Sequence, residues 1–383
     1  MVTTMDLNAL RTELDGIDDQ LNALFLKRMN LCAQVAAYKK EQGLPILNTG
    51  REREILSRIS AQAGDELDGY ARILFSTLFD LSRTYQGQLM APESAVAEEI
   101  RSALEHTPQL FPKKAVVACQ GVEGAYAQQA CDKTFAFADI MYFRTWEGVF
   151  SAVQKGLCQY GVLPIENSSH GSVSGVYDLM RSFDFHIVRG VKLHISHSLM
   201  ARPGTKLQDI REICSHEQAI GQCSAFLKGL PEVKVTVCEN TAAAAKMVAE
   251  SGRTDMAAIS SPVCAGIYGL AELESGIQDT DNNYTRFIVI SKEPEIYPGA
   301  DHLSLMFKVG HTPGSLTRIL SRFSSMGLNM TKLESRPISG ADFHYMFYLD
   351  FEGSIYDEQV VKLLSELEQE LELFVFLGAY SEV

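Results

Sequence analysis

The stretch YGVLPIENSSHGSV (residues 160–173) carries the strongest fold signal in this 383-residue chain. Its first half is apolar and predicts a buried strand, whereas its second half is a run of polar residues and glycine that a turn alone does not require. In α/β proteins, the carboxyl ends of strands line ligand clefts. The stretch therefore predicts an α/β domain with a cleft at residues 166–172.

The segment around this stretch, residues 114–294, alternates apolar runs with helical patterns. We expect parallel strands at AVVACQ, IMYF, SLMA, VKVTVC, MAAIS and RFIVIS, with helices such as 146–156 and 241–250 between them. His197 lies in the alternating run LHISHSL and is expected on the polar face of a strand. One sheet and two small lobes around a cleft are both compatible with this length.

Residues 1–92 predict an all-helical domain of three helices. Apolar side chains from Leu7 to Tyr38 recur at alternating spacings of three and four, which is a heptad seam. The first helix, from about residue 6 to 42, would be roughly 55 Å long. The other helices are expected from about residue 48 and from about residue 70 to 88. Two short partners cannot cover so long a seam, so we expect an intertwined homodimer or a higher homo-oligomer.

The remaining segments are a linker and a C-terminal α+β domain. Residues 93–113 lack a sustained pattern and predict the linker. Residues 299–383 predict strands and helices in the order βαββαβ, which is the ferredoxin-like unit. Thr312 and Pro313 are expected to start its first helix, and Gly327 to end it.

Composition excludes several classes of protein. The formal net charge of −14 argues against nucleic acid or an anionic membrane as a partner. No apolar stretch approaches the roughly 20 residues that span a bilayer, and the N-terminus does not resemble a signal peptide. The eight cysteines are scattered, which predicts reduced thiols in a cytoplasmic protein and neither disulfides nor a metal site.

Cations within the first helix are the candidate ligand-binding residues of the N-terminal domain. Arg28 occupies a seam position without an acidic neighbour one turn away, so its buried charge needs a partner from elsewhere. Arg11 and Lys39 border the same seam. Three cations around one apolar seam suit a small polyanion, although pairing with acids of other helices remains an alternative. Glu52 also fits a capping box with Thr49.

This pattern resembles the all-helical chorismate mutases, on Arg11, Arg28, Lys39, Arg51, Glu52, Ser82 and Gln86. The resemblance implies that Arg28 and the partner's Arg11 hold the two carboxylates of chorismate. It assigns the other contacts as follows: Arg51 and Ser82 assist the arginines, Lys39 and Gln86 bond the ether oxygen, and Glu52 bonds the ring hydroxyl. Such a rearrangement needs a compact conformer and donors where charge grows, without a nucleophile. Asn48 stands where the family usually has Asp, and we expect weakened activity from it.

The middle segment resembles the bacterial prephenate dehydratases through GVEGAY (121–126), the stretch 160–173 and NYTRF (283–287). The resemblance implies that Thr285 is the residue most needed for catalysis, beside Arg286 and Phe287. It places further cleft residues at Glu166, Asn167, Ser168, Ser215, Gln222 and Glu239. Prephenate would lose CO2 and its ring hydroxyl to give phenylpyruvate. The residues leave open whether Thr285, a glutamate or a water is the proton donor.

The C-terminal unit resembles the ACT regulatory domains through PGSLT (313–317) and ESRP (334–337). A glycine-containing helix start leaves backbone N–H groups free for a carboxylate. The resemblance implies an allosteric site for phenylalanine at Gly314, Ser315, Leu316, Glu334, Ser335, Arg336 and Pro337. A simple dimerisation module is the alternative.

In this order, the three resemblances imply the bifunctional chorismate mutase/prephenate dehydratase family of phenylalanine biosynthesis. Such a chain would act on chorismate and prephenate without metal or cofactor, under inhibition by phenylalanine. The sequence has no GxGxxG motif, which disfavours fusion with a prephenate dehydrogenase. Two alternatives remain: arogenate as the substrate of the dehydratase, and a two-lobed binding module without enzymatic activity.

Overall fold

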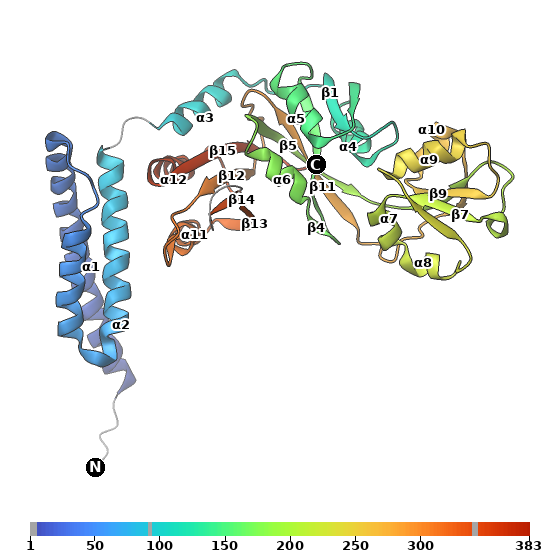
Figure 1. The fold of residues 1–383 in the computed structure, drawn as a ribbon. Helices are drawn as coiled ribbons and strands as arrows, with labels where there is room; N and C mark the ends of the chain where they lie inside the picture. Colours follow the sequence, from blue (N-terminus) through green and yellow to red (C-terminus); the bar gives the residue numbers. More distant parts are fainter. Residues whose placement is uncertain (1–5, 91–93, 339–343) are drawn as a thin grey trace, which may run out of the picture. The chain divides into compact units, whose positions relative to one another are not determined.

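The computed structural model describes residues 6–90, 94–338 and 344–383 (Figure 1). The chain divides into two compact units. The first contains the helices α1 (Leu7–Gln42) and α2 (Thr49–Met90) together with Lys362–Leu371. The second contains Glu98–Val361 and Glu372–Val383.

The helices of the first unit, together called the helical hairpin, are α1 and α2, which folds back on itself at Gly64. Local chemistry explains where these helices start and stop. Helix α1 begins at Asp6, whose side chain accepts from the N–H of Asn8, and ends at Gly43 with a positive φ of 64°. Asn48 Oδ1 accepts from the N–H of Arg51 at 3.0 Å and caps α2. Helix α2 is broken at Gly64, with φ 70° and ψ 170°. The second and third predicted helices therefore meet at Gly64.

The predicted seam of α1 lies on the surface of the single chain. Its nine members are 37–64% exposed, and Ala36 is the residue of α1 that is fully buried. The seam consists of Leu7, Leu10, Leu14, Ile17, Leu21, Leu24, Leu31, Val35 and Tyr38. The periodicity predicted the helix, but α2 does not cover its apolar face.

The second unit begins with the helix α3 (Ala95–His106) and a mixed sheet in the order β2-β1-β3-β11-β5, with β4 paired to β3. Strand β1 runs parallel to β2 and β3, whereas β11 is antiparallel to β3 and β5. The strands are β1 (Lys114–Gln120), β2 (Phe137–Phe143), β3 (Tyr160–Asn167), β4 (Gly171–Ser172), β5 (His186–His194) and β11 (Tyr284–Ser291). The helices beside them are α4 (Tyr126–Thr134), α5 (Trp146–Gln154) and α6 (Ser174–Met180).

A second sheet forms a separate lobe in the order β10-β6-β9-β7-β8. Figure 1 shows its helices α9 and α10 apart from α4 and α5 of the first lobe. The strands are β6 (Ser198–Ala201), β7 (Glu212–Ser215), β8 (Lys234–Val237), β9 (Met256–Ser260) and β10 (Ala271–Glu274). The helices are η1 (Leu207–Asp209), α7 (Glu217–Gln222), α8 (Ser224–Lys228), α9 (Thr241–Glu250) and α10 (Val263–Tyr268). Two lobes therefore replace the single-sheet alternative, and the expectation of purely parallel pairing is wrong.

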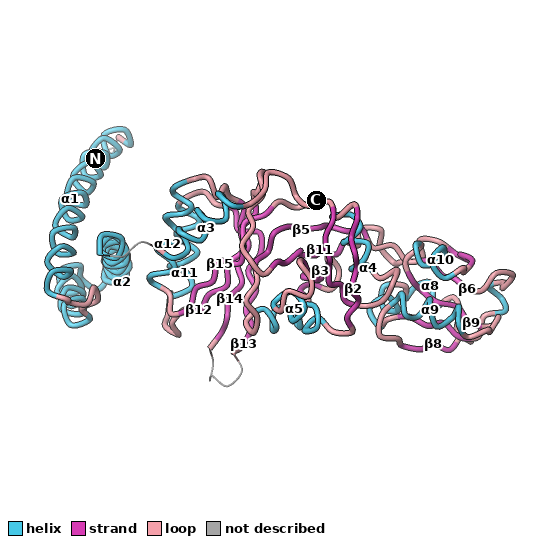
Figure 2. Tube along the Cα trace, turned by 90° about the horizontal axis from the view of Figure 1, so that it is seen from above, coloured by secondary structure: helices cyan, strands magenta, loops and turns pink. Residues whose placement is uncertain are grey.

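The third sheet has the predicted βαββαβ order and is antiparallel throughout, as β13-β14-β12-β15. Its elements are β12 (His302–Lys308), α11 (Ser315–Ser325), β13 (Asn329–Pro337), β14 (Tyr345–Glu352), α12 (Glu358–Glu370) and β15 (Leu373–Tyr380). Figure 2 shows α11 on one side of these strands. Gly327 ends α11 as expected, but the N-cap is Gly314 with φ 80°, two residues later than predicted.

The C-terminal residues connect this sheet to the first lobe. The N–H groups of Gly190 and Lys192 on β5 donate to the carbonyls of Ser381 and Val383 at 3.0 and 2.9 Å. A Cβ on Gly378 would lie 2.2 Å from the carbonyl oxygen of Ile187. Only glycine permits this approach, so the C-terminal sheet rests directly against β5.

Candidate active sites and effector pocket

A cavity of about 300 Å³ lies between the two lobes of the second unit. The first lobe contributes Tyr126, Trp146, Pro164, Asn167, Thr285 and Phe287, and the second contributes His197, His216, Gln222, Glu239 and Thr241. Five residues of this lining were predicted from the sequence as site residues of the dehydratase: Asn167, Gln222, Glu239, Thr285 and Phe287. The structure brings them together from segments more than 100 residues apart.

A β-bulge explains how β3 faces this cavity. Asn167 pairs with Thr285 and Pro164 pairs with Phe287 across β3 and β11, and the register shifts between these two pairs. Ile165 is the extra residue on β3, so Pro164 and Asn167 both line the cavity although an odd number of positions separates them. Regular pairing of Asn167 with Thr285 thus places an amide and a hydroxyl side by side, and the bulge adds Pro164 to the same face.

The hydrogen bonds of Asn167 determine the direction of the Thr285 hydroxyl. Asn167 Oδ1 accepts from the N–H groups of Ser169 and His170, both at 3.0 Å. Its amide nitrogen must therefore be the donor to Thr285 Oγ1 and to Asn283 Oδ1, both at 2.9 Å. Because Thr285 Oγ1 already accepts this bond, its own hydrogen is available to an acceptor in the cavity.

His197 and Gln222 form a second polar network in the cavity. His197 Nε2 lies 2.8 Å from Gln222 Oε1, and its Nδ1 lies 3.2 Å from the hydroxyl of Tyr126. Burial lowers the pKa of His197, and the hydrogen bond with Gln222 raises it by less, so the ring is neutral at pH 7. We assign the hydrogen to Nε2, which donates to Gln222. The Gln222 amide nitrogen then points to His170 Nδ1 at 3.2 Å.

Four predicted cleft residues do not line the cavity. Ser215 is fully buried and donates to the carbonyl of Ile259 at 2.7 Å. Ser168 donates to the carbonyl of Asn282 at 3.1 Å. Glu166 and Arg286 are register partners and lie on the opposite face of the sheet, because side chains alternate along each strand.

The guanidinium of Arg286 is enclosed by the C-terminal sheet. It donates to Glu382 Oε2 at 2.6 Å, to Asp350 Oδ2 at 2.7 Å and to the hydroxyl of Tyr380 at 2.9 Å. Burial opposes the charged form, but Tyr380 and the two carboxylates raise the pKa of Arg286 above its ordinary value. Ser304 completes the cluster by donating to Asp350 Oδ1 at 2.6 Å. Arg286 therefore links β11 to the C-terminal sheet, and its guanidinium bonds to protein groups.

The first unit pairs several of its predicted site residues across the helical hairpin. Arg28 donates to Ser82 Oγ and, at 3.1 Å, to the carbonyl of Leu78. Lys39 Nζ donates to Gln86 Oε1 at 3.1 Å and to the carbonyl of Ile46 at 2.6 Å. Ser82 and Gln86 are only 4% and 7% exposed. Donors thus gather along α1 and the second half of α2, as the spacing predicted.

The other predicted residues of this unit have different surroundings. Arg11 is exposed, and Arg51 makes an exposed ion pair with Glu54 at 2.7 Å. Glu52 pairs with Arg83, and Asn48 supplies the cap that the sequence assigned to Thr49. Arg83 carried no signal in the sequence, because its role depends on how α2 packs against itself beyond Gly64.

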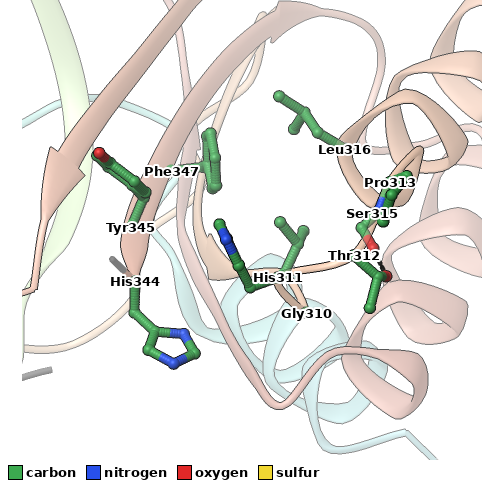
Figure 3. A pocket seen from close by; sticks show the side chains of 10 residues that line it. Gly310, His311, Thr312, Pro313, Ser315, Leu316, His344, Tyr345 and Phe347 are labelled. Carbon is green, nitrogen blue, oxygen red and sulfur yellow. Dashed lines mark hydrogen bonds between the residues drawn. The ribbon is translucent and has the colours of Figure 1, made fainter. Parts of the chain in front are cut away.

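A pocket of about 390 Å³ lies at the start of α11 (Figure 3). Ser315 and Leu316 line it, together with His311, His344 and Phe347. Figure 3 shows Leu316 and Phe347 extending toward the pocket from the helix and the strand β14. The predicted segment 334–337 does not line it. Instead, Glu334 accepts from Ser172 at 2.7 Å and Arg336 pairs with Asp178 at 2.8 Å.

Known proteins share this combination of domains. The family model for type II chorismate mutase matches residues 10–87, and that for prephenate dehydratase matches residues 117–295. The bifunctional chorismate mutase/prephenate dehydratase of Aquifex aeolicus is 32% identical over 377 residues, which cover 98% of both chains. The chain belongs to the bifunctional chorismate mutase/prephenate dehydratase family.

Two further similar proteins match a smaller share of the chain. The arogenate dehydratase/prephenate dehydratase 2 of Arabidopsis thaliana is 37% identical over 75% of this chain and 82% of its own. The prephenate dehydratase of Arthrobacter aurescens, solved in complex with L-Phe, is 30% identical with a TM-score of 0.64. It matches 70% of this chain and 90% of its own.

Two features, a membrane-spanning helix and a metal-binding cluster, are absent from the part of the chain that the structure describes. No helix within residues 6–90, 94–338 and 344–383 is long and apolar enough to cross a membrane. In the same part of the chain, His, Cys, Asp and Glu side chains form no group of three that could hold a metal ion.

Proposed function

We propose that the chain catalyses two consecutive reactions, chorismate to prephenate in its first unit and prephenate to phenylpyruvate in the cavity of its second. The Asn167–Thr285 contact is the observation that carries the second assignment. It leaves a polarised hydroxyl hydrogen facing the cavity between the lobes, and departure of a ring hydroxyl requires such a donor.

In the dehydratase step, the Thr285 hydroxyl donates a hydrogen bond to the ring hydroxyl of prephenate as its C–O bond breaks. The electron pair of the bond to the carboxylate moves into the ring, which becomes aromatic as CO2 leaves. The departing oxygen takes the hydrogen-bonded proton of Thr285 and leaves as water, and Thr285 regains a proton from solvent. Asn167 holds Thr285, and the amide of Gln222, oriented by neutral His197, is a second donor. Glu239 and Phe287 also line the cavity beside the substrate.

In the mutase step, the protein holds chorismate in its compact conformer and stabilises the charge that grows on the ether oxygen. We assign Arg28 and Ser82 to a carboxylate, and Lys39 and Gln86 to the ether oxygen. We keep Glu52 for the ring hydroxyl, and Arg51 and the partner's Arg11 for the carboxylates. Asn48 caps the N-terminus of α2, so it affects the mutase site by stabilising the start of this helix.

We also propose that two copies pair through α1. The nine seam residues are 37–64% exposed in one chain, and a continuous apolar stripe of this length needs a covering partner. A second copy of α1 has the matching heptad pattern. Such pairing would bring the partner's Arg11, which is exposed in its own chain, to the site of Arg28.

We assign phenylalanine to the pocket at the start of α11, in a domain of the ACT type. No side chain caps the start of α11 behind Gly314, although the N–H of Ser315 donates to the carbonyl of Thr312 at 3.2 Å. This helix start suits the carboxylate of phenylalanine, and Leu316 with Phe347 suit its ring. The segment Glu334, Ser335, Arg336 and Pro337 lies outside this pocket within one chain. A second copy would have to supply it. The relative from Arthrobacter aurescens, solved with L-Phe, supports this choice of effector.

We propose that both reactions take place in the cytoplasm, because all eight cysteines are free thiols. One experiment tests both activities: purified protein receives chorismate alone, and prephenate and phenylpyruvate are followed together. Formation of prephenate without phenylpyruvate would contradict the dehydratase assignment. Parallel assays with prephenate and arogenate decide between the two substrates that the name of the Arabidopsis relative combines.

A further inference from the structure

A lysine of the C-terminal sheet contacts the β3–β4 hairpin on the face opposite the cavity. Lys332 on β13 donates to Glu166 Oε1 on β3 at 2.6 Å and to Ser172 Oγ on β4 at 2.7 Å. Ser172 Oγ in turn donates to Glu334 Oε2 at 2.7 Å. One ammonium group therefore bridges the two strands of the hairpin, and Ser172 connects it to the carboxylate of Glu334.

This hairpin is the element that holds Asn167. Glu166 pairs with Ser172, and Asn167 pairs with Gly171, at the two ends of the short ladder. The loop between them supplies the N–H groups of Ser169 and His170 that fix Asn167 Oδ1. A shift of β4 relative to β3 would change both contacts, and with them the bond from Asn167 to Thr285.

The contact is well shielded from water. The side chain of Lys332 is 14% exposed, and those of Glu166 and Glu334 are 34% and 19% exposed. Without the ammonium group, Glu166 would lose its ion-pair partner, whereas Glu334 would keep Arg336 at 4.0 Å. The Glu166 carboxylate would then gain solvation if the hairpin moved away from β13.

We propose that Lys332 is a positioning residue of the dehydratase: through Glu166 and Ser172 it holds the β3–β4 hairpin in the register that directs Asn167 toward Thr285. The inference rests on the proposed dehydratase function. It gives the C-terminal domain a part in the reaction even without effector, because β13 supplies the lysine. It also gives Glu166 a role behind the cavity, in place of the predicted contact with substrate.

The test is steady-state kinetics of the full chain without phenylalanine. Lys332→Met keeps the aliphatic stem and removes the charge. We expect the dehydratase kcat to fall at least about tenfold with KM changed less than about twofold, because small displacements of a catalytic group reduce rate more than binding. Lys332→Arg, which can still bridge two oxygens, should recover most of the rate. The mutase rate of the same preparation should stay at the wild-type value.

Lys308→Met is the matched control. Lys308 lies on β12 of the same sheet, is similarly shielded at 18% exposure, and pairs with Glu372 of its own domain at 2.8 Å. Its dehydratase kcat should match that of the wild type. The proposal is overturned if Lys332→Met keeps its kcat, if only its KM rises, or if Lys308→Met loses rate equally. A wild-type chain that does not turn over prephenate would contradict the proposed function itself.

Discussion

The two catalytic regions differ in how much of their core one chain provides. Strand β3 and strand β11 are buried on both sides, and the cavity between the lobes is lined by residues of a single chain. Helix α1 has one fully buried residue, and its apolar seam lies open. The α/β region therefore buries both catalytic strands within one chain, whereas the helical region leaves the apolar seam of α1 exposed in one chain.

The largest effect is expected where a charge enters the open seam. Leu21→Asp would bury a carboxylate in each copy of the proposed dimer at a cost of several kcal/mol, reducing association by about a thousandfold. Mutase activity should fall with dimerisation while the dehydratase rate remains. Sedimentation and both assays measure this. Asn22→Asp, one position off the seam and exposed, is the control and should change neither.

The next largest effect should come from the hydroxyl in the cavity. Thr285→Ala removes the donor and should lower the dehydratase kcat by about a hundredfold or more. Thr285→Ser keeps the hydroxyl and should retain much of the rate. The mutase rate of both variants should equal that of the wild type. Full phenylpyruvate production by Thr285→Ala would refute the role given to this residue.

A smaller effect is expected on the face of the first sheet that lies opposite the cavity. Tyr380→Phe removes the hydrogen bonds of the hydroxyl with Arg286 and Ser304 and leaves both ion pairs in place. We expect a loss of stability of about 2 kcal/mol, because a single hydrogen bond contributes about 1 kcal/mol, and a dehydratase KM close to that of the wild type. Urea denaturation and kinetics measure the two. A large rise in KM would instead support contact between Arg286 and substrate.

The smallest difference between the two regions is expected in mild acid, where the stability of one region should fall more than that of the other. All nine histidines lie between residues 106 and 344, outside the helical hairpin. Burial lowers the pKa of His186, His197 and His216, so the unfolded chain binds more protons below its ordinary histidine pKa of about 6.5. Stability of the second unit should therefore fall as pH drops from 7 to 5, while the helical hairpin is little affected.

Calorimetry at several pH values gives the test. The transition assigned by loss of dehydratase activity should move to lower temperature on acidification, and the mutase transition should stay. His197→Gln should reduce the shift. Equal movement of both transitions would contradict the assignment to buried histidines.

The sequence predicted the site best where a motif and its spacing coincide. Asn167 and Thr285 were identified in this way, and the structure places them 2.9 Å apart. His197 was assigned to a polar strand face, because alternation alone does not reveal that its ring meets Tyr126 and Gln222. Arg83 had no signal at all, since its partner Glu52 lies 31 residues away.

Local chemistry, then, is determined by the sequence alone: the heptad seam of α1, the strand–polar pattern of residues 160–173, the βαββαβ order and the residue types of both sites. Tertiary structure decided which of two residues adjacent in the sequence faces the cavity. Thr285 and Arg286 are adjacent in one motif, yet one lines the cavity and the other is enclosed by Asp350, Tyr380 and Glu382. The physical reason is that strand pairing, with a bulge at Ile165, fixes the face of each side chain, and pairing is a property of distant segments.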